Sequence, residues 1–453
     1  MSLDLPISIL STTAPAILPG TYLEKGQSLL GLAVFLFVAW LIGRVRGNRQ
    51  IPWRVICWGV ALQFIFGALV LYSPNTLYAV QAAVQKLLEF SNAGAKMVFG
   101  NSLVDGTAAV QGSAGQVVGT AQLGFNFAVI VLPTIIFVSL LTAVLYHLGV
   151  LQVVVFSFAW VMQKTMKCSG AETLSTAANI FVGQTEAPLI VRPYLQLATR
   201  SELLAIMVGG FSNIASGVLV AYTAMLQNYV QNAGGHLAAA CLISAPATLV
   251  IAKLLMPETG EPRTAGQMRL KFDRTDANLF DAATRGTSEG LMLALNVGAM
   301  LIAFTALVAL LNYFFGSASV WLNLASSDAP LTIEQVLGYV FAPVMWLCGV
   351  PWHEAGKAGS LLGVKTVLNE FLAYLQMSQG YANDAQFLSP RSGLITTYAL
   401  CGFANFASIG IQIGGVSSLA PDRRADLSRI ALLAMVGGTL ATLTGACVVG
   451  VLI

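Results

Sequence analysis

The chain has 453 residues, of which 56% are hydrophobic and only 9% are charged. Soluble domains carry about 25% charged residues, so this composition excludes an ordinary soluble protein and indicates a polytopic membrane protein. The formal net charge of +3 is small and fits basic cytoplasmic loops, so no nucleic-acid partner is expected. The N-terminus lacks the basic region of a cleaved signal, and the six cysteines include no CxxC pair.

Hydropathy predicts an all-α protein with eight transmembrane helices, at about residues 27–43, 55–73, 125–149, 202–226, 237–256, 289–315, 392–416 and 428–453. Arginines without intervening acids follow the first span: Arg44, Arg46, Arg49 and Arg54. This asymmetry predicts that the N-terminus lies outside the cytoplasm, and eight spans then return the C-terminus to the same side. The loop 257–285 is the most polar part of the chain and is expected to be cytoplasmic.

Two segments between the spans have the pattern of amphipathic helices that lie along the membrane interface. In the first, apolar residues share one helical face: Leu77, Val80, Val84, Leu87 and Leu88. Polar residues are expected on the opposite face: Gln81, Gln85, Lys86 and Glu89. The second segment opens at 332 with a capping box, Thr-Ile-Glu-Gln, followed by an apolar face that includes Ile333 and Val340. The Gly-, Ala- and Ser-rich segment 101–122 is interpreted as a loop.

The stretch 170–198 is apolar at both ends but contains Gln184-Thr185-Glu186 in its middle. This polar centre favours a re-entrant hairpin that enters from the cytoplasmic side. A carboxylate inside the membrane is costly, which makes Glu186 a candidate functional residue. A second candidate hairpin, 356–379, contains Asn369 and Glu370. The alternative for both glutamates is a carboxylate at a helix end that reaches interfacial water.

The two hairpins are each followed by a related motif. Gly210-Phe-Ser-Asn-Ile-Ala-Ser216 matches Gly402-Phe-Ala-Asn-Phe-Ala-Ser408 at five positions. Three predicted spans separate the hairpins, so the two copies should enter from opposite faces as an inverted repeat. Such repeats usually hold the substrate at their interface near the midplane. Close helix packing through small residues is the alternative explanation of the motif.

The polar residues of the two copies would converge on one site: Gln184, Thr185, Glu186, Asn369, Glu370, Asn405 and Ser408. Carboxylates, amides and nearby phenyl rings suit a neutral, polyhydroxylated or amide-bearing solute with a flat face. A phosphorylated solute would require basic groups there, and Arg192 and Lys365 are expected toward the hairpin edges. The chain has no GxxxxGK[ST], HExxH or GxSxG motif, so no catalytic residue or organic cofactor is predicted. An intramembrane enzyme and a channel are the other classes considered.

Several motifs in register resemble the concentrative nucleoside transporter family. They are Gly183-Gln-Thr-Glu-Ala-Pro-Leu189, Arg192-Pro-Tyr194, Gly209-Gly-Phe211, Ala294-Leu-Asn-Val-Gly-Ala299, Lys365-Thr-Val-Leu-Asn-Glu-Phe371 and Cys401-Gly-Phe-Ala-Asn405. The resemblance covers residue 25 to the C-terminus. It implies a homotrimeric, cation-coupled nucleoside symporter of the elevator type, in a bacterial inner membrane. The chain is accordingly divided into N-terminal scaffold helices with the interfacial helix (1–122), a first repeat (123–256), a cytoplasmic loop (257–286) and a second repeat (287–453).

The resemblance also assigns roles to residues. It implies that the nucleobase faces Gln184, Thr185 and Glu186, with Phe403 packed on the base and Val218 nearby. It implies that the ribose hydroxyls bind Glu370, Asn405 and Ser408. The sodium ligands it implies are the Asn179 and Asn213 side chains and the Val182 and Ile214 carbonyls. Asn213 stands where the family pattern has a small hydroxyl residue, and an amide oxygen is also a ligand for a hard cation. Sodium is the expected coupling ion, and the alternatives are proton coupling through Glu186 or Glu370 and transport of another small polar solute.

Overall fold

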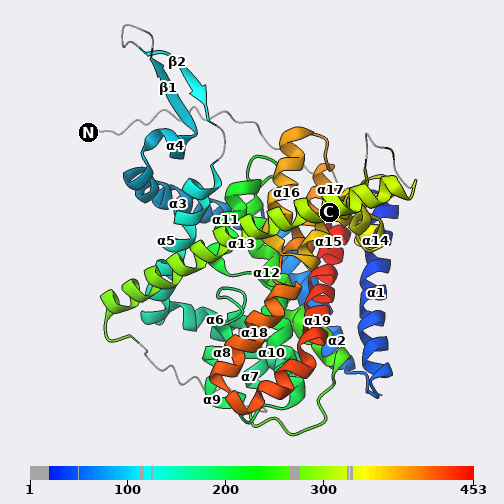
Figure 1. Cartoon of the computed structure of the whole chain (residues 1–453). Coiled ribbons are helices and arrows are strands. Elements are labelled where there is room, and N and C mark those ends of the chain that lie inside the picture. Colours follow the sequence, from blue (N-terminus) through cyan, green and yellow to red (C-terminus); the bar gives the residue numbers. More distant parts are fainter. Residues whose placement is uncertain are drawn as a thin grey trace.

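The computed structural model describes residues 20–48, 50–111, 117–123, 126–264, 276–323, 326 and 330–453. Within these ranges the chain is almost entirely helical, with one small pair of β-strands (Figure 1). Residues 1–19, on which the absence of a signal peptide was judged, lie outside the described part. The same holds for Arg269, Lys271 and Arg274 of the loop predicted to be cytoplasmic.

Seven helical segments in the described residues are long and apolar enough to cross a membrane. They are α1 (Tyr22–Val45), α2 (Trp53–Leu71), α5 (Phe127–His147), α10 with α11 (Arg200–Ser212 and Ser216–Leu226), α12 (Ala233–Leu255), α13 (Leu279–Trp321) and the C-terminal segment Pro421–Leu452, which contains α19 (Arg424–Leu452). An eighth is reached only if α14 (Ile333–Leu347) and α15 (Trp352–Val367), which are bent by 116°, count as one span. These helices make the chain a multi-pass membrane protein.

The predicted span 392–416 is wrong as a continuous helix. It is divided into α17 (Pro390–Leu400) and α18 (Phe406–Leu419), with residues 401–405 between them. The physical reason is a side-chain cap: Asn405 has extended backbone, and its amide oxygen accepts from the Ser408 N–H at 2.9 Å. An asparagine cap of this kind starts a new helix. The apolar run 392–416 is therefore divided between two helices. The break between α10 and α11, at residues 213–215, begins at Asn213, which aligns with Asn405 in the second copy of the motif.

The segment 101–122 is not the loop expected from its composition. It forms the short helix α4 (Asn101–Asp105) and the antiparallel strands β1 (Thr107–Gln111) and β2 (Val117–Gln122). Gly106 ends α4 with φ of 66°, a left-handed conformation that glycine adopts without strain. Threonine and valine on both strands favour the extended backbone, a preference that the small residues around them concealed.

The first amphipathic segment is helix α3 (Pro74–Phe99), but its faces differ from the prediction. Gln81, expected on the polar face, is buried with Leu77, Val84 and Leu88. Its amide oxygen accepts from the backbone N–H groups of Gly234 and Gly235 at 2.9 and 3.2 Å, at the start of α12. The second segment is α14, and its capping box is confirmed, because the Thr332 and Gln335 side chains each accept from the other's backbone N–H.

The two segments predicted as hairpins each contain helices interrupted by non-helical residues. The first, 170–198, contains α7 (Gly170–Ala178), a break at 179–186, and the short helices α8 (Ala187–Ile190) and α9 (Arg192–Leu195); it is preceded by α6 (Val150–Met166). The second consists of α15 and α16 (Glu370–Asn383), with the break at 368–369. Lys365 does not lie at the edge of the second hairpin as expected. It is fully buried, and its ammonium donates to the Ala399 carbonyl and the Thr442 hydroxyl.

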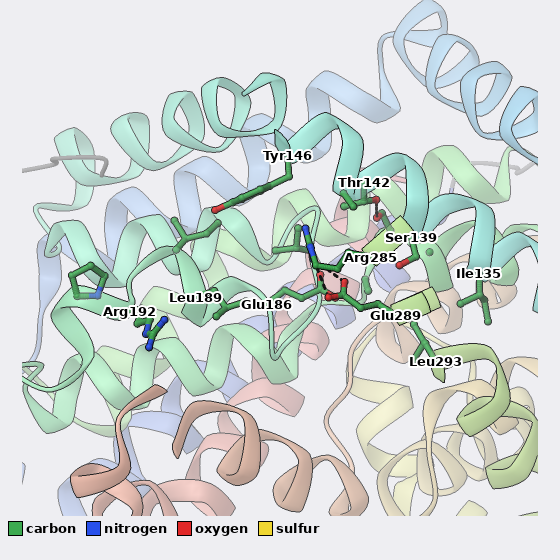
Figure 2. Close-up of a pocket in the computed structure, with 17 residues that line it drawn as sticks. Ile135, Ser139, Thr142, Tyr146, Glu186, Leu189, Arg192, Arg285, Glu289 and Leu293 are labelled. Carbon is green, nitrogen blue, oxygen red and sulfur yellow. Dashed lines mark hydrogen bonds and ion pairs between the residues drawn. The ribbon is translucent and has the colours of Figure 1, made fainter. Parts of the chain in front are cut away.

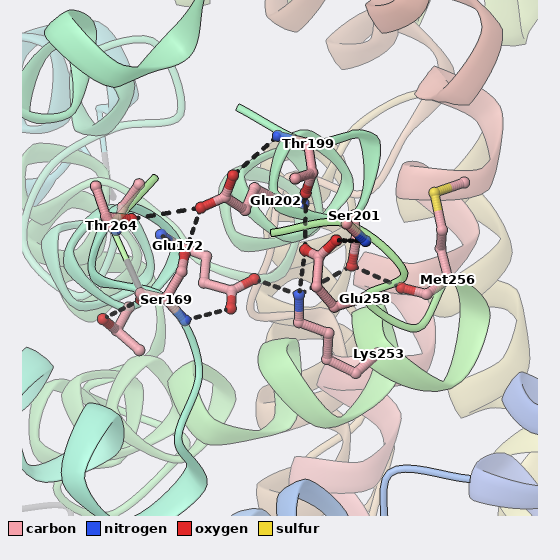
Figure 3. Close-up of polar contacts among 12 residues, drawn as sticks. Ser169, Glu172, Thr199, Ser201, Glu202, Lys253, Met256, Glu258 and Thr264 are labelled. Atoms are coloured by element: carbon pink, nitrogen blue, oxygen red, sulfur yellow. Dashed lines mark hydrogen bonds and ion pairs between the residues drawn. The ribbon is translucent and has the colours of Figure 1, made fainter. Parts of the chain in front are cut away.

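A buried polar network holds the base of the first hairpin against α10 and α12 (Figure 3). The Lys253 ammonium lies 2.6 Å from the Glu172 carboxylate and 3.6 Å from the Glu258 carboxylate. The Ser169 hydroxyl donates to Glu202 at 2.6 Å, which links the first residues of α7 and α10. The Thr264 hydroxyl also donates to Glu202, at 3.4 Å. The network therefore holds the start of α7 against α10, α12 and the residues that follow α12.

The elements differ strongly in burial. In the windows that could span a membrane, α10–α11 and α12 are each 89% buried, whereas α13 is only 11% buried. With 43 residues, α13 extends beyond the predicted span 289–315 at both ends and is about 65 Å long. Figure 1 shows it running obliquely along the outside of the packed helices. The two ends of the described chain meet, since the Gly20 N–H donates to the Ile453 carbonyl at 2.6 Å.

Candidate functional site

The breaks in the helices bring together residues that are far apart in the sequence. The backbone N–H of Ser216, after the α10–α11 break, donates to the Phe181 carbonyl in the first hairpin at 3.3 Å. In the second copy, Asn369 starts α16 and Asn405 starts α18, each by capping the new helix with its side chain. These caps satisfy backbone groups that would otherwise lack partners at the interior of the protein. The polar residues at the breaks are therefore held in defined positions.

Glu370 is the central polar residue of the second copy. It is the first residue of α16, it is buried, and its two carboxylate oxygens have different partners. One accepts from the Tyr222 hydroxyl of α11 at 2.9 Å, and the other accepts from the Asn405 amide at 3.0 Å. Because Tyr222 belongs to the first copy and Asn405 to the second, Glu370 joins the two. Glu370 and Asn405, which were predicted separately as substrate-binding residues, are in direct contact.

A second contact between the copies involves Gln184 and Ser408. The Gln184 amide donates to the Ser408 hydroxyl at 3.4 Å, and both side chains are buried. Thr185 packs on α18, where its methyl group lies 2.8 Å from the position of a Cβ on Gly415. Val218 is buried on α11 and Phe403 is half-buried in the α17–α18 break.

Glu186 faces a different space from the other predicted substrate residues. Its carboxylate accepts from the Gly183 N–H at 3.1 Å and lines a cavity of about 180 Å³ (Figure 2). The remaining walls come from α5, α11 and α13, and they include Arg285 and Glu289. Gln184, Glu370 and Asn405 do not line this cavity. Of the predicted substrate-binding residues, Glu186 is the one in the lining of this cavity.

The residues expected to bind a cation lie on two adjoining breaks. Asn179 ends α7, and its amide N–H donates to the Ser175 carbonyl at 3.0 Å, which leaves the amide oxygen for another partner. Asn213 ends α10 and is 2% exposed, yet neither atom of its amide has a hydrogen-bond partner. Val182 and Ile214 are also buried. Amide and carbonyl oxygens suit a hard cation such as Na⁺, so the unpartnered Asn213 oxygen fits the donor set.

Two further polar residues belong to this region and escaped the sequence analysis. The sequence did not indicate a polar role for Tyr222, because a tyrosine on an apolar helix usually contributes its ring to packing. Gln412 is 1% exposed on α18, donates to the Met207 carbonyl at 3.1 Å, and has an amide oxygen without a partner. Its spacing of four residues from Ser408 places it on the same helical face, which was the available signal. Within the described residues, no group of three His, Cys, Asp or Glu side chains is arranged to hold a metal ion.

Comparisons with known proteins show the family of this chain. Three family models match: Na⁺ dependent nucleoside transporter N-terminus over residues 30–102, nucleoside recognition over residues 128–229, and Na⁺ dependent nucleoside transporter C-terminus over residues 236–450. An uncharacterized transporter of Haemophilus influenzae is 41% identical, over 94% of this chain and 97% of its own length. Sodium/nucleoside cotransporter 1 of Rattus norvegicus is 38% identical over 95% of this chain, and the match spans 64% of the rat protein.

The fold is likewise similar to solved structures. The structure of CNTnw in an inward-facing substrate-bound state has a TM-score of 0.82 and 39% identity, over 94% of this chain and 97% of that one. A CNTnw variant in an outward-facing state has a TM-score of 0.84 and 38% identity, over 95% of this chain and 98% of that one. This chain belongs to the concentrative nucleoside transporter family, the Na⁺-dependent nucleoside transporters. It is a membrane transporter and not an enzyme.

Proposed function

We propose that this protein takes up nucleosides across the inner membrane by symport with Na⁺. The observation that carries the proposal is the buried polar set formed by Glu370, Asn405 and Tyr222 at the junction of the two copies of the motif. A carboxylate there accepts hydrogen bonds from the hydroxyl groups of a ribose, and the amides of Gln184 and Asn405 offer both donors and acceptors. Phe403 and Val218 supply apolar surface for a base.

The proposed cation site consists of the side chains of Asn179 and Asn213 and the carbonyls of Val182 and Ile214. A bound Na⁺ would supply a positive charge that draws these oxygen ligands together. Asn179 is fixed by its bond to Ser175, and Asn213 would gain a partner for its buried oxygen. Proton coupling through Glu186 or Glu370 is the second candidate, favoured by the position of Glu186 in a cavity rather than in the packed core.

The proposed transport mechanism is of the elevator type. The well-buried core around α10–α12, together with the two hairpins, would move relative to a scaffold that includes the exposed helix α13. We propose three such chains per assembly, two hairpins entering from opposite faces, and both termini outside the cytoplasm. The contact between Gly20 and Ile453 supports placing both ends on the same side of the membrane, and the arginines after the first span support the outside. The same proposal divides the chain into N-terminal scaffold helices (1–122), a first repeat (123–256), a cytoplasmic loop (257–286) and a second repeat (287–453).

The test is uptake of radiolabelled uridine into proteoliposomes under an inward Na⁺ gradient, an inward proton gradient, or no gradient. Accumulation driven by Na⁺ supports the proposal in full. Accumulation driven by protons alone retains the nucleoside substrate and transfers coupling to a hairpin glutamate. Absence of uptake for uridine, cytidine and adenosine by folded protein would overturn nucleoside transport and favour another small polar solute.

A further inference from the structure

Basic side chains gather where the ends of three helices lie close together. The end of α1 and the start of α2 are joined by the short connection 46–52. The Arg54 guanidinium, at the start of α2, donates to the Thr165 carbonyl in the last turn of α6 at 3.0 Å. We call the exposed basic residues at these three helix ends the basic patch; they are Arg44, Arg46, Arg54, Lys164 and Lys167.

The basic patch is not neutralised by acidic side chains. The chain has no aspartate or glutamate from residue 25 to 88 or from 106 to 171, so no acid is near the patch in sequence. None of its five side chains forms an ion pair within the described part of the chain. Exposed lysines elsewhere do, as in the pairs Lys96–Asp105 and Lys357–Asp384. The basic patch therefore presents uncompensated positive charge to whatever lies against it.

Tryptophans beside the basic patch place it at the level of the membrane surface. The Lys164 ammonium lies 4.7 Å from the centre of the Trp160 ring, and the Arg44 guanidinium lies 5.4 Å from that of Trp40. Trp53, the first residue of α2, is 65% exposed. Tryptophan rings are enriched at the boundary between hydrocarbon and headgroups. The cationic groups next to these rings therefore lie beside lipid headgroups.

The backbone at Lys167 is unusual for a lysine. The residue ends α6 with φ of 56° and ψ of 32°, a left-handed conformation in which glycine is the usual residue after a helix. A residue with a Cβ atom is strained there, because the Cβ approaches the following carbonyl oxygen. Strain of this kind is typical of functional positions. It indicates a use for the exposed Lys167 ammonium outside the fold.

The chemistry of the basic patch fits a phosphodiester at the membrane surface. Phosphate oxygens accept charge-assisted hydrogen bonds from guanidinium and ammonium groups. Clusters of about four to eight basic residues beside a membrane helix are typical of sites for anionic lipids. Leu41 of α1 and Trp58 of α2 are 43% and 44% exposed about one turn farther into the spans, where they would contact acyl chains. A water-soluble anion would make no use of this apolar surface.

We propose that the basic patch binds the headgroup of an anionic phospholipid, such as phosphatidylglycerol, between the start of α2 and the end of α6. The phosphate would bridge Arg54 of α2 and the lysines Lys164 and Lys167 of α6, whose helix ends already touch. Ser169, which caps α7, is only two residues beyond Lys167, so the lipid would hold the base of the first hairpin. The inference is independent of which solute or ion the protein transports.

Thermal unfolding of the detergent-solubilised protein tests the proposal without regard to its orientation in a membrane. Phosphatidylglycerol, phosphatidylcholine and inorganic phosphate are added separately. We expect phosphatidylglycerol to raise the Tm by at least about 3 °C, and the other two to leave it unchanged. An equal rise with phosphatidylcholine would show a general effect of lipid, and a rise with inorganic phosphate would show an anion site without lipid. Either result, or no rise with phosphatidylglycerol, overturns the proposal.

Two double variants locate the effect. Arg54→Gln with Lys164→Gln removes two charges from the basic patch, and Arg424→Gln with Arg429→Gln removes two exposed charges of α19 that lie outside it. We expect the first variant to lose the rise in Tm with phosphatidylglycerol and the second to retain it. The same rise in both variants would place the lipid elsewhere on the protein and refute the assignment.

Lys167→Gly separates lipid binding from a role in the fold. Glycine adopts the left-handed backbone without strain, so the Tm without lipid should be at least that of the parent. The rise in Tm with phosphatidylglycerol should fall by at least half, because one cationic contact is lost. If the lysine serves only to complement the C-terminal dipole of α6, the substitution should instead lower the Tm without lipid. That result, or an undiminished rise, would contradict the proposed contact.

Discussion

Single buried polar side chains join the two halves of this protein. Glu370 bonds to Tyr222 of one copy and Asn405 of the other, and Gln184 bonds to Ser408. Each is surrounded by apolar residues, where an unmade hydrogen bond costs about 1–3 kcal/mol. A solute that replaces one of these partners must therefore present hydroxyl or amide groups of matching geometry. At this scale the specificity of the protein is a matter of hydrogen-bond complementarity.

We expect Glu370→Gln to weaken nucleoside binding at least tenfold. The substituted side chain is an amide with only one acceptor oxygen. Its N–H group would therefore face one of the two donors that Glu370 now accepts from, the Tyr222 hydroxyl or the Asn405 amide. Loss of a charge-assisted hydrogen bond costs about 1.5–3 kcal/mol, and 1.4 kcal/mol corresponds to a factor of ten. Titration calorimetry on the solubilised protein measures the Kd for nucleoside. Glu334→Gln, on α14, is the control, and unchanged affinity in Glu370→Gln would contradict the assigned role.

Asn179→Ala should raise the Na⁺ concentration that gives half-maximal uptake, because it removes one of the proposed oxygen ligands. The bond from Asn179 to Ser175 is within one turn of α7, so its loss should cost little of the fold. The measurement is initial uptake against Na⁺ concentration in proteoliposomes. Asn312→Ala, which removes an amide bonded to Glu334 far along α13, serves as the control. An identical Na⁺ dependence in both variants would argue against a cation at Asn179.

At the scale of elements, the helix breaks are possible because the ends of the helices are anchored. The capping box of α7 and that of α10 share one buried network with Lys253. The breaks at 179–186 and 213–215 lie at the other ends of the same two helices. Because the network stabilises one end of each helix, the non-helical residues at the other end can include unpaired polar groups, such as the amide of Asn213.

Lys253→Met should destabilise the protein by about 3–5 kcal/mol, since it leaves the buried Glu172 without its counter-ion. Thermal unfolding of the purified protein, followed by tryptophan fluorescence, should show a clear fall in Tm. Lys357→Met removes a comparable pair with Asp384, but those side chains are 46% and 54% exposed. An exposed pair contributes about 0–1 kcal/mol, so this control should unfold near the parent temperature. Equal Tm values would refute the structural role of the network.

The contact between α5 and α13 can be tested with two glycines of one helix. Gly286→Leu would place its Cβ within 2.9 Å of the Leu140 Cα and should separate the helices. Gly298→Leu would meet only the end of the Leu132 side chain, at 3.6 Å. We expect the first variant to lose most of its uptake and thermal stability and the second to retain both. Similar behaviour of the two would mean that the helices do not depend on this contact.

At the scale of the whole molecule, the order of the spans predicts which surfaces share a side. Five segments able to cross a membrane lie between Leu23 and Glu261, an odd number. On a Cys57→Ser background, Leu23→Cys should therefore react with an impermeant thiol reagent from outside, and Glu261→Cys only from the cytoplasmic side. Labelling of intact and inverted vesicles measures this. Reaction of both from one side would refute the span order, and exchanged sides would refute the orientation.

Much of this architecture follows from local sequence patterns. Long apolar runs predicted most of the spans, and the Thr332–Gln335 box was confirmed because a cap is made by residues three positions apart. Predictions failed where a contact from elsewhere in the chain decided the outcome. Gln81 is buried because α12 begins with two N–H groups beside it, and Lys365 is buried because α17 and α19 supply acceptors. Neither partner is near in sequence.

The sequence by itself determined the class of this protein, because hydropathy and a series of motifs in register are properties of consecutive residues. It also indicated the residues that carry polar chemistry, among them Glu186, Glu370 and Asn405. Only the tertiary structure decided how these residues are grouped: Asn405 donates directly to Glu370, whereas Glu186 lines a cavity together with Arg285 and Glu289. The physical reason is that burial and hydrogen bonding depend on which helices pack together, and that packing is set by shape and small residues over the whole chain.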